Sequence, residues 1–120
     1  MRVDQEINPD RRSVVLTVTG KLSDEGLLGL ADVLEKIRLA DNASVLIDLR
    51  RSDGVSVTAA GVRKMAARRL VLSPDSRRAV VVPSALGFGM ARMYALIRGT
   101  GSYRVFMDYQ RARQWVETGR

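Results

Sequence analysis

The chain has 120 residues, of which 46% are hydrophobic and 28% charged, with a formal net charge of +7 at pH 7. This length suits one hydrophobic core and is too short for two, so we predict a single domain over residues 1–120. Cysteine and histidine are both absent, which excludes disulfides, thiolate nucleophiles, cysteine-bound metal centres and imidazole acid–base catalysis. We therefore expect no catalytic residues, no metal and no cofactor, and we predict that the protein is not an enzyme.

No apolar run approaches the roughly 18 residues of a transmembrane helix, and the first residues lack the apolar segment of a signal peptide. A cytoplasmic location is therefore expected. The chain then opens with alternating residues over Arg2–Ile7, which predict an amphipathic strand at a sheet edge. Asn8-Pro9-Asp10 supplies turn residues, and the β-branched stretch Ser13–Thr19 predicts an antiparallel partner strand.

A first helix is predicted from Ser23, a favourable N-cap, to about Leu39. Asp24 and Glu25 stand at the positive end of this helix, where acidic residues are stabilising. Its inward stripe recurs at helical spacing and consists of Leu27, Leu30, Ala31, Leu34 and Ile37.

The central strand is predicted over Ala43–Arg50, because a near-continuous apolar run with charge at its exit is typical of a buried parallel strand. A polar loop follows, and Thr58 can cap a second helix. The buried side of that helix is expected to contain Val62, Met65, Ala66 and Leu70.

Three more segments complete the domain. Arg78–Pro83 predicts a buried strand, ended by a proline that cannot donate to a ladder. A third helix follows Gly87-Phe88-Gly89, and the last strand, Tyr103–Met107, leads to a helix capped by Asp108. Two inward stripes are expected in these helices, one of Met90, Met93, Tyr94 and Ile97, the other of Ala112, Trp115 and Val116.

The predicted order is ββαβαβαβα, with five strands and four helices. Alternation of strand and helix implies parallel strands joined by right-handed crossovers. Binding sites of such sheets lie at the carboxyl ends of the strands, where Asp48 ends one strand and Ser84 follows the next. The acidic pair and the lysine of a phosphoryl-accepting receiver domain are missing, so Asp48 is interpreted as a strand-end cap that bonds the local backbone.

Two further groups are candidate binding residues. Gly87 and Gly89 resemble a phosphate loop, to which Arg92 would add charge, but a tight turn with close helix–sheet approach is the favoured interpretation. The second helix carries a basic face that consists of Arg63, Lys64, Arg68 and Arg69. A solvated face is favoured there over an acidic protein or membrane partner, and nucleic acid is the least favoured because stacking aromatics are few.

Several stretches resemble a known family, namely VLIDLR at Val45–Arg50, AVVVPSALGFGMARMY at Ala79–Tyr94 and VFMDYQRARQW at Val105–Trp115. With the TAAGV that opens the second helix, they resemble the STAS domain of anti-sigma-factor antagonists. More closely, the chain is similar to the SpoIIAA-like family of small bacterial STAS/SEC14-type proteins. The resemblance implies an α/β STAS fold with a mixed, mostly parallel five-stranded sheet and four helices.

In STAS antagonists the second helix opens with Asp-Ser-Ser-Gly, and a partner kinase phosphorylates the second serine. The matching positions here are Thr58, Ala59, Ala60 and Gly61. Ala60 cannot accept a phosphate, so we expect the family phosphoswitch to be absent, with Thr58 or Ser56 as substitute acceptors.

We predict a non-enzymatic, regulatory or binding module of STAS type with a protein partner. Its binding rim would include Asp48, Arg50, Thr58, Gly61, Ser84, Gly87, Gly89 and Arg92. The alternative is a carrier of a small apolar or lipid-like ligand, recognisable by an internal cavity that contains Leu86, Phe88, Met90 and Met93. A homodimer, formed through the first strand, is a further hypothesis.

Overall fold

The computed structural model describes residues 1–10, 12–37, 42–68, 76–98 and 103–119. The predicted order ββαβαβαβα is confirmed. The elements are β1 (Arg2–Ile7), β2 (Ser13–Ser23), α1 (Asp24–Lys36), β3 (Ser44–Ser56), α2 (Ala59–Ala67), β4 (Arg78–Val81), α3 (Ala85–Arg98), β5 (Tyr103–Phe106) and α4 (Tyr109–Thr118).

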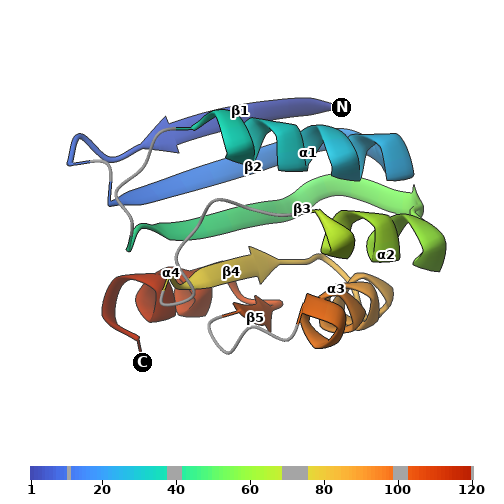
Figure 1. Cartoon of the computed structure of the whole chain (residues 1–120). Helices are drawn as coiled ribbons and strands as arrows, with labels where there is room; N and C mark the ends of the chain where they lie inside the picture. Colours follow the sequence, from blue (N-terminus) through green and yellow to red (C-terminus); the bar gives the residue numbers. More distant parts are fainter. Residues whose placement is uncertain (11, 38–41, 69–75, 99–102, 120) are drawn as a thin grey trace.

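The five strands form one mixed sheet in the order β1-β2-β3-β4-β5. β1 pairs antiparallel with β2, and every later pair is parallel. The edge position of β1 and its antiparallel partner agree with the sequence prediction. Because the last four strands are parallel, their carboxyl ends meet at one edge of the molecule, to the right in Figure 1.

The helices divide unequally between the two faces of the sheet (Figure 1). α1, α2 and α3 share one core cluster with the residues of the sheet face beneath them, while α4 packs on the opposite face in a second cluster. The α4 cluster contains Ala112, Trp115 and Val116 of α4, together with Leu46 of β3. These three α4 residues are those that the sequence predicted to be buried.

Strands β2 and β3 are longer than predicted. The segment after Arg50 was expected to be a polar loop, yet β3 continues to Ser56 and β2 continues to Ser23. The two extensions pair with each other, as in the partnership of Gly20 with Ser52. The sequence prediction missed them because a polar ribbon beyond the core lacks the apolar pattern that marks a buried strand.

Helix boundaries also differ from the prediction. α1 ends at Lys36 rather than near Leu39, and both Leu39 and Leu70 lie outside the described residues. Gly87 and Gly89 are not in a turn but in the first turns of α3, where the Ser84 hydroxyl accepts a hydrogen bond from the Gly87 N–H at 3.2 Å. Within the described part of the chain, none of the helices has the length and apolar character to cross a membrane.

Candidate functional site

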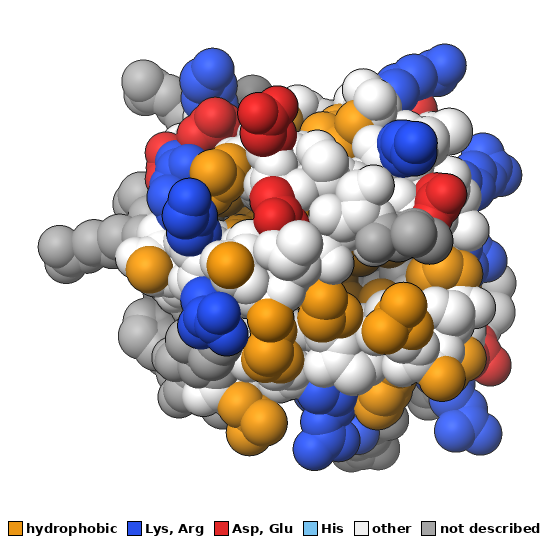
Figure 2. All heavy atoms as spheres, turned by 90° about the vertical axis from the view of Figure 1, so that its right-hand side faces the viewer, with side chains coloured by type: hydrophobic (Ala, Val, Ile, Leu, Met, Phe, Trp, Pro, Cys, Tyr) orange, Lys and Arg blue, Asp and Glu red, His pale blue; other side chains and the backbone are white. Residues whose placement is uncertain are grey.

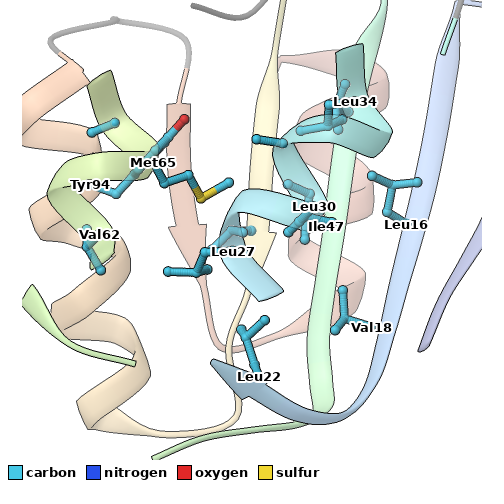
Figure 3. Close-up of a cluster of buried hydrophobic side chains, with 14 of the residues drawn as sticks. Leu16, Val18, Leu22, Leu27, Leu30, Leu34, Ile47, Val62, Met65 and Tyr94 are labelled. Carbon is cyan, nitrogen blue, oxygen red and sulfur yellow. The ribbon is translucent and has the colours of Figure 1, made fainter. Parts of the chain in front are cut away.

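An apolar cavity of about 370 Å³ lies between the sheet and the three helices on its face. Val45, Ile47 and Val80 form part of its floor. Leu27 of α1 and Met65 of α2 lie on its opposite side, and Figure 3 shows that their side chains, with that of Tyr94 from α3, extend into the same region. The cavity is therefore built from the core positions that the helical and strand patterns predicted.

The mouth of the cavity lies at the carboxyl ends of β3 and β4. Its lining there includes residues that are exposed to solvent, among them Asp53, Gly54, Pro83, Ser84 and Leu86. Leu86 is 68% exposed. Figure 2 views this end of the molecule, where hydrophobic side chains gather with lysine and arginine side chains around them.

The lining of the cavity also includes one arginine and two tyrosines. Arg78 is buried at the start of β4, and its register partner in β5 is Tyr103. The rings of Tyr94 and Tyr103 lie 5.1 Å apart between centroids. Burial raises the pKa of the Tyr103 phenol above its usual range, Tyr94 adds to the rise, and the charge of Arg78 acts in the opposite direction. The Tyr103 hydroxyl is therefore protonated at neutral pH.

The start of α2 is tied to the start of α1. Thr58 caps α2, as predicted, by accepting the Gly61 N–H at 3.1 Å. Asp24 in turn accepts the Thr58 N–H at 2.8 Å and the Thr58 hydroxyl at 2.6 Å. These two hydrogen bonds, the side-chain one first, hold the pKa of the Asp24 carboxyl below its ordinary value. The Asp24 carboxylate therefore lies at the N-terminus of α2.

Asp48 and Arg50 lie on the opposite face of the sheet, beside α4. Asp48 is 3% exposed and accepts hydrogen bonds from the Arg50 backbone N–H at 3.0 Å and from its guanidinium at 2.9 Å. The guanidinium also lies 4.3 Å from the centre of the Tyr109 ring. Burial acts to raise the pKa of Asp48, but the bonds and charge of Arg50 outweigh it, so the pKa lies below its ordinary value.

The sheet thus divides the rim that the sequence predicted. Ser84 and Gly87 line the cavity, whereas Asp48 and Arg50 face α4. At Gly89 a methyl group would meet no described atom within 4 Å, so no close approach explains this glycine. Arg92 is exposed on α3.

The basic face of α2 is less positive than its sequence indicates. Arg63 and Lys64 are exposed. Arg68, however, forms ion pairs of 2.7 Å with Asp32 and Glu35 of α1. Arg69 lies outside the described residues.

The sequence model of the family described as SpoIIAA-like matches residues 13–117. The chain belongs to the SpoIIAA-like family. It is also similar to the crystal structure, at 2.25 Å resolution, of an uncharacterised protein of the DUF3478 family with a SpoIIAA-like fold from Shewanella loihica PV-4. That likeness has a TM-score of 0.58 at 21% identity and covers 96% of this chain and 92% of the other, which shows a common fold. No curated protein matches the chain.

Membership of the SpoIIAA-like family confirms the resemblance and the STAS-type α/β fold that the sequence predicted. Sequence reasoning nevertheless missed three residues of the site. Asp24 was interpreted only as a charge near a helix end, and Arg78 was not expected to line a cavity. Tyr103 was assigned to the last strand without a role. The positions of these residues in the folded protein depend on strand register and on helix–helix packing. Neither can be predicted from a local sequence pattern.

Proposed function

We propose that this member of the SpoIIAA-like family is a non-enzymatic module that binds a small apolar ligand in its cavity. The observation that carries the proposal is the cavity itself, about 370 Å³ between α1, α2, α3 and the sheet. Protein interiors are packed like organic crystals and contain few voids larger than a water molecule. An apolar pocket of this size leaves much of its lining without packing contacts, and a bound apolar molecule would supply them.

Size and lining agree with this role. Pockets for small molecules are usually about 300–1,000 Å³, mostly apolar, with a few polar groups that orient the ligand. Leu86 and Met90, which the carrier hypothesis named, do line the cavity. Phe88 and Met93, also named, are instead partly buried residues that pack against the core cluster.

Native mass spectrometry of freshly purified protein tests the proposal. We expect a bound mass in addition to the mass of the chain, and we expect 1-decanol, added to delipidated protein, to raise the unfolding temperature in a saturable way. Any ligand that binds only the folded state stabilises it by mass action. A chain that carries no bound mass and does not respond to 1-decanol or to related apolar probes would contradict the proposal.

A regulatory protein partner is a second candidate, favoured by the exposed pair Arg63 and Lys64 on α2. An acidic partner would lose affinity when both charges are reversed, in the variant R63E/K64E. The matched control is reversal of Arg111, which is exposed on α4 on the opposite face of the sheet. If R63E/K64E retains every partner of the wild-type protein in pull-down experiments, α2 is not the binding surface.

The cytoplasmic location and the homodimer both stay predictions. β1 forms one edge of the sheet, and edge strands are the usual places for a second chain to pair. Light scattering coupled to size-exclusion chromatography distinguishes a monomer of 13.3 kDa from a dimer.

A further inference from the structure

The excess positive charge of the chain is confined to one segment. Residues 54–107 contain nine lysine and arginine residues and one acidic residue, whereas the rest of the chain contains eleven basic and twelve acidic residues. The segment includes α2 and α3, which pack against each other and contain no acidic residue. Arg63 and Lys64 on α2 and Arg92 on α3 are exposed. The outer side of this helix pair is therefore positively charged.

Apolar side chains are exposed at the starts of the same two helices. Both helices follow parallel strands and begin at the carboxyl edge of the sheet, to the right in Figure 1. Leu86 is exposed in the first turn of α3 and also lines the mouth of the cavity. Figure 2 shows hydrophobic side chains at this end with lysine and arginine side chains beside them. We call the exposed apolar and basic residues here the helix-pair face, which consists of Ala59, Ala60, Arg63, Lys64, Pro83, Ala85, Leu86 and Arg92.

The composition of the helix-pair face selects its partner. Basic side chains at headgroup level, with apolar side chains between them, are typical of proteins that lie on anionic membranes. A second copy docked by two-fold symmetry would instead bring Arg63, Lys64 and Arg92 against the same residues of its partner, and like charges repel. Two carboxylates border the face, Asp53 at the cavity mouth and Asp24, which already accepts two hydrogen bonds from Thr58. The face therefore keeps an excess of positive charge.

We infer that the helix-pair face docks reversibly on an anionic lipid bilayer, with the cavity mouth toward the lipid. The docking goes beyond the proposed function and does not require it; only the route that docking gives an apolar ligand, between bilayer and cavity, rests on that function. Leu86 inserts below the headgroups, and the three bases contact headgroup anions. Because even a single myristoyl chain gives only marginal binding, one leucine is insufficient alone. Docking therefore needs the leucine and the bases together, and it is lost at high salt.

Co-sedimentation of the full chain with lipid vesicles tests the docking. At low salt, vesicles of equal parts phosphatidylcholine and phosphatidylserine should bind at least about tenfold more tightly than vesicles of phosphatidylcholine alone. Each base near an anionic surface contributes about fivefold in affinity, so Arg63→Gln/Lys64→Gln should weaken binding at least about tenfold. Leu86→Ser should weaken it about tenfold, through the lost burial of one leucine. All three positions are exposed, so the fold should be retained.

The matched control removes two charges at the opposite edge of the sheet, where the parallel strands begin. Arg12 precedes β2 and Lys36 ends α1, and both are exposed. Arg12→Gln/Lys36→Gln has the same net charge as Arg63→Gln/Lys64→Gln and should bind vesicles as the wild-type protein does. An equal loss in the two double variants would indicate general charge attraction and contradict the docking. A Leu86→Ser variant that binds normally would contradict it as well.

Failure of the docking and failure of the proposed function are distinguishable. Isothermal titration of 1-decanol without vesicles measures the cavity, and Arg63→Gln/Lys64→Gln should retain the wild-type affinity because neither residue lines it. Wild-type protein that binds 1-decanol but sediments with neither kind of vesicle would overturn the docking alone. Protein that sediments as expected but binds no 1-decanol would overturn the proposed function alone. Tighter binding to soluble polyglutamate than to the vesicles, unaffected by Leu86→Ser, would replace the bilayer by an acidic protein partner.

Discussion

The carboxylate of Asp24 accepts both the backbone N–H and the hydroxyl of Thr58, at 2.8 and 2.6 Å, and so joins the first turns of α1 and α2. The contact requires a glycine one turn into α2. A Cβ atom at Gly61 would lie 2.0 Å from the Asp24 Oδ1 atom. The glycine that the family resemblance singled out therefore has a steric role, because any larger residue would displace the carboxylate that holds the helix cap.

Gly61→Ala should lower the free energy of unfolding by about 1–3 kcal/mol, the usual range for extra atoms forced into a packed site. Urea unfolding monitored by circular dichroism measures the change. The loss should largely disappear in the background of Asp24→Ala, where the added methyl group has room, so a double-mutant cycle should show strong coupling.

Gly89→Ala is the matched control for this glycine. It also adds a methyl group in the first half of a helix, but at a site where no described atom lies within 4 Å. It should be neutral or stabilise the protein by up to ~1 kcal/mol, because alanine favours helix over glycine. If Gly61→Ala behaves like Gly89→Ala, the Asp24 contact does not constrain α2.

Thr58 should be a poor site for a negative charge. Its hydroxyl donates to Asp24, so an aspartate at this position would lose the donor and bring two carboxylates together. Thr58→Asp should therefore be less stable than Thr58→Ser, which keeps the hydroxyl, and Asp24→Asn should rescue part of the loss. Thr58→Ala, which removes the cap alone, should cost about 0.5–2 kcal/mol.

Ser56 provides the comparison, because it is exposed at the end of β3. Ser56→Asp should stay within about 0.5 kcal/mol of the wild-type protein, as surface substitutions usually do. Thermal unfolding of these variants measures the differences. A Thr58→Asp variant as stable as wild type would leave Thr58 open as a phosphoswitch in place of Ala60.

The Asp24–Thr58 contact should also depend on pH. The pKa of Asp24 is lowered from its ordinary value of 3.8 in the folded protein, first by the Thr58 hydroxyl and then by the Thr58 N–H. The stabilisation is therefore complete above 3.8 and is lost as the pH falls through the lowered folded value. The stability difference between wild type and Asp24→Asn should be constant near neutral pH and shrink in acid. A difference that persists unchanged in strong acid would mean that the charge of Asp24 is irrelevant.

The sequence predicted the fold better than the site. The order of strands and helices along the chain and the caps at Ser23, Thr58 and Asp108 follow from local chemistry, which a single sequence contains. Extension of β3 to Ser56 could not be predicted, because its polar residues pair with β2 outside the core. Local sequence patterns predict burial and helix caps. They do not predict a strand whose backbone is held only by pairing with a neighbouring strand.

The candidate site depends on which face of the sheet a residue occupies. Asp48 and Ile47 are neighbours in the sequence, yet one faces α4 and the other the cavity, since side chains of a strand alternate. The binding rim that the sequence predicted was defined by the ends of strands, and it therefore combined residues from both faces of the sheet. Arg78 was not expected to line the cavity for the opposite reason: it lies at the amino end of β4, away from the edge where open sheets usually bind ligands.

Arg50 should stabilise the protein through Asp48. Arg50→Met would leave a carboxylate of 3% exposure without its guanidinium partner. Removing one member of a fully buried pair costs about 3–5 kcal/mol; here we expect about 1–3 kcal/mol, because the Arg50 side chain is 45% exposed and screened by water. Chemical denaturation should also show partial recovery in Asp48→Asn/Arg50→Met. The control, Arg51→Met at an exposed position, should have little effect; an equal loss there would indicate a general charge effect.

Filling the cavity should stabilise the protein and block ligand binding. Ala91 lines the cavity from α3 and is half-buried. In a tightly packed site Ala91→Leu would cost about 1–3 kcal/mol through overpacking. In an unfilled apolar cavity the added carbons gain contacts worth up to ~0.8 kcal/mol per buried methylene. The sign of the change in unfolding free energy therefore distinguishes a cavity from a packed core.

We expect Ala91→Leu to raise the free energy of unfolding of the delipidated protein by about 1 kcal/mol and to weaken 1-decanol binding at least about tenfold. Ala67→Leu adds the same atoms at an exposed position of α2 and should change neither quantity appreciably. The two measurements constrain each other, because a leucine that occupies the space of the ligand must stabilise the empty protein while it excludes the ligand. A variant that is destabilised yet binds 1-decanol normally would place the ligand elsewhere.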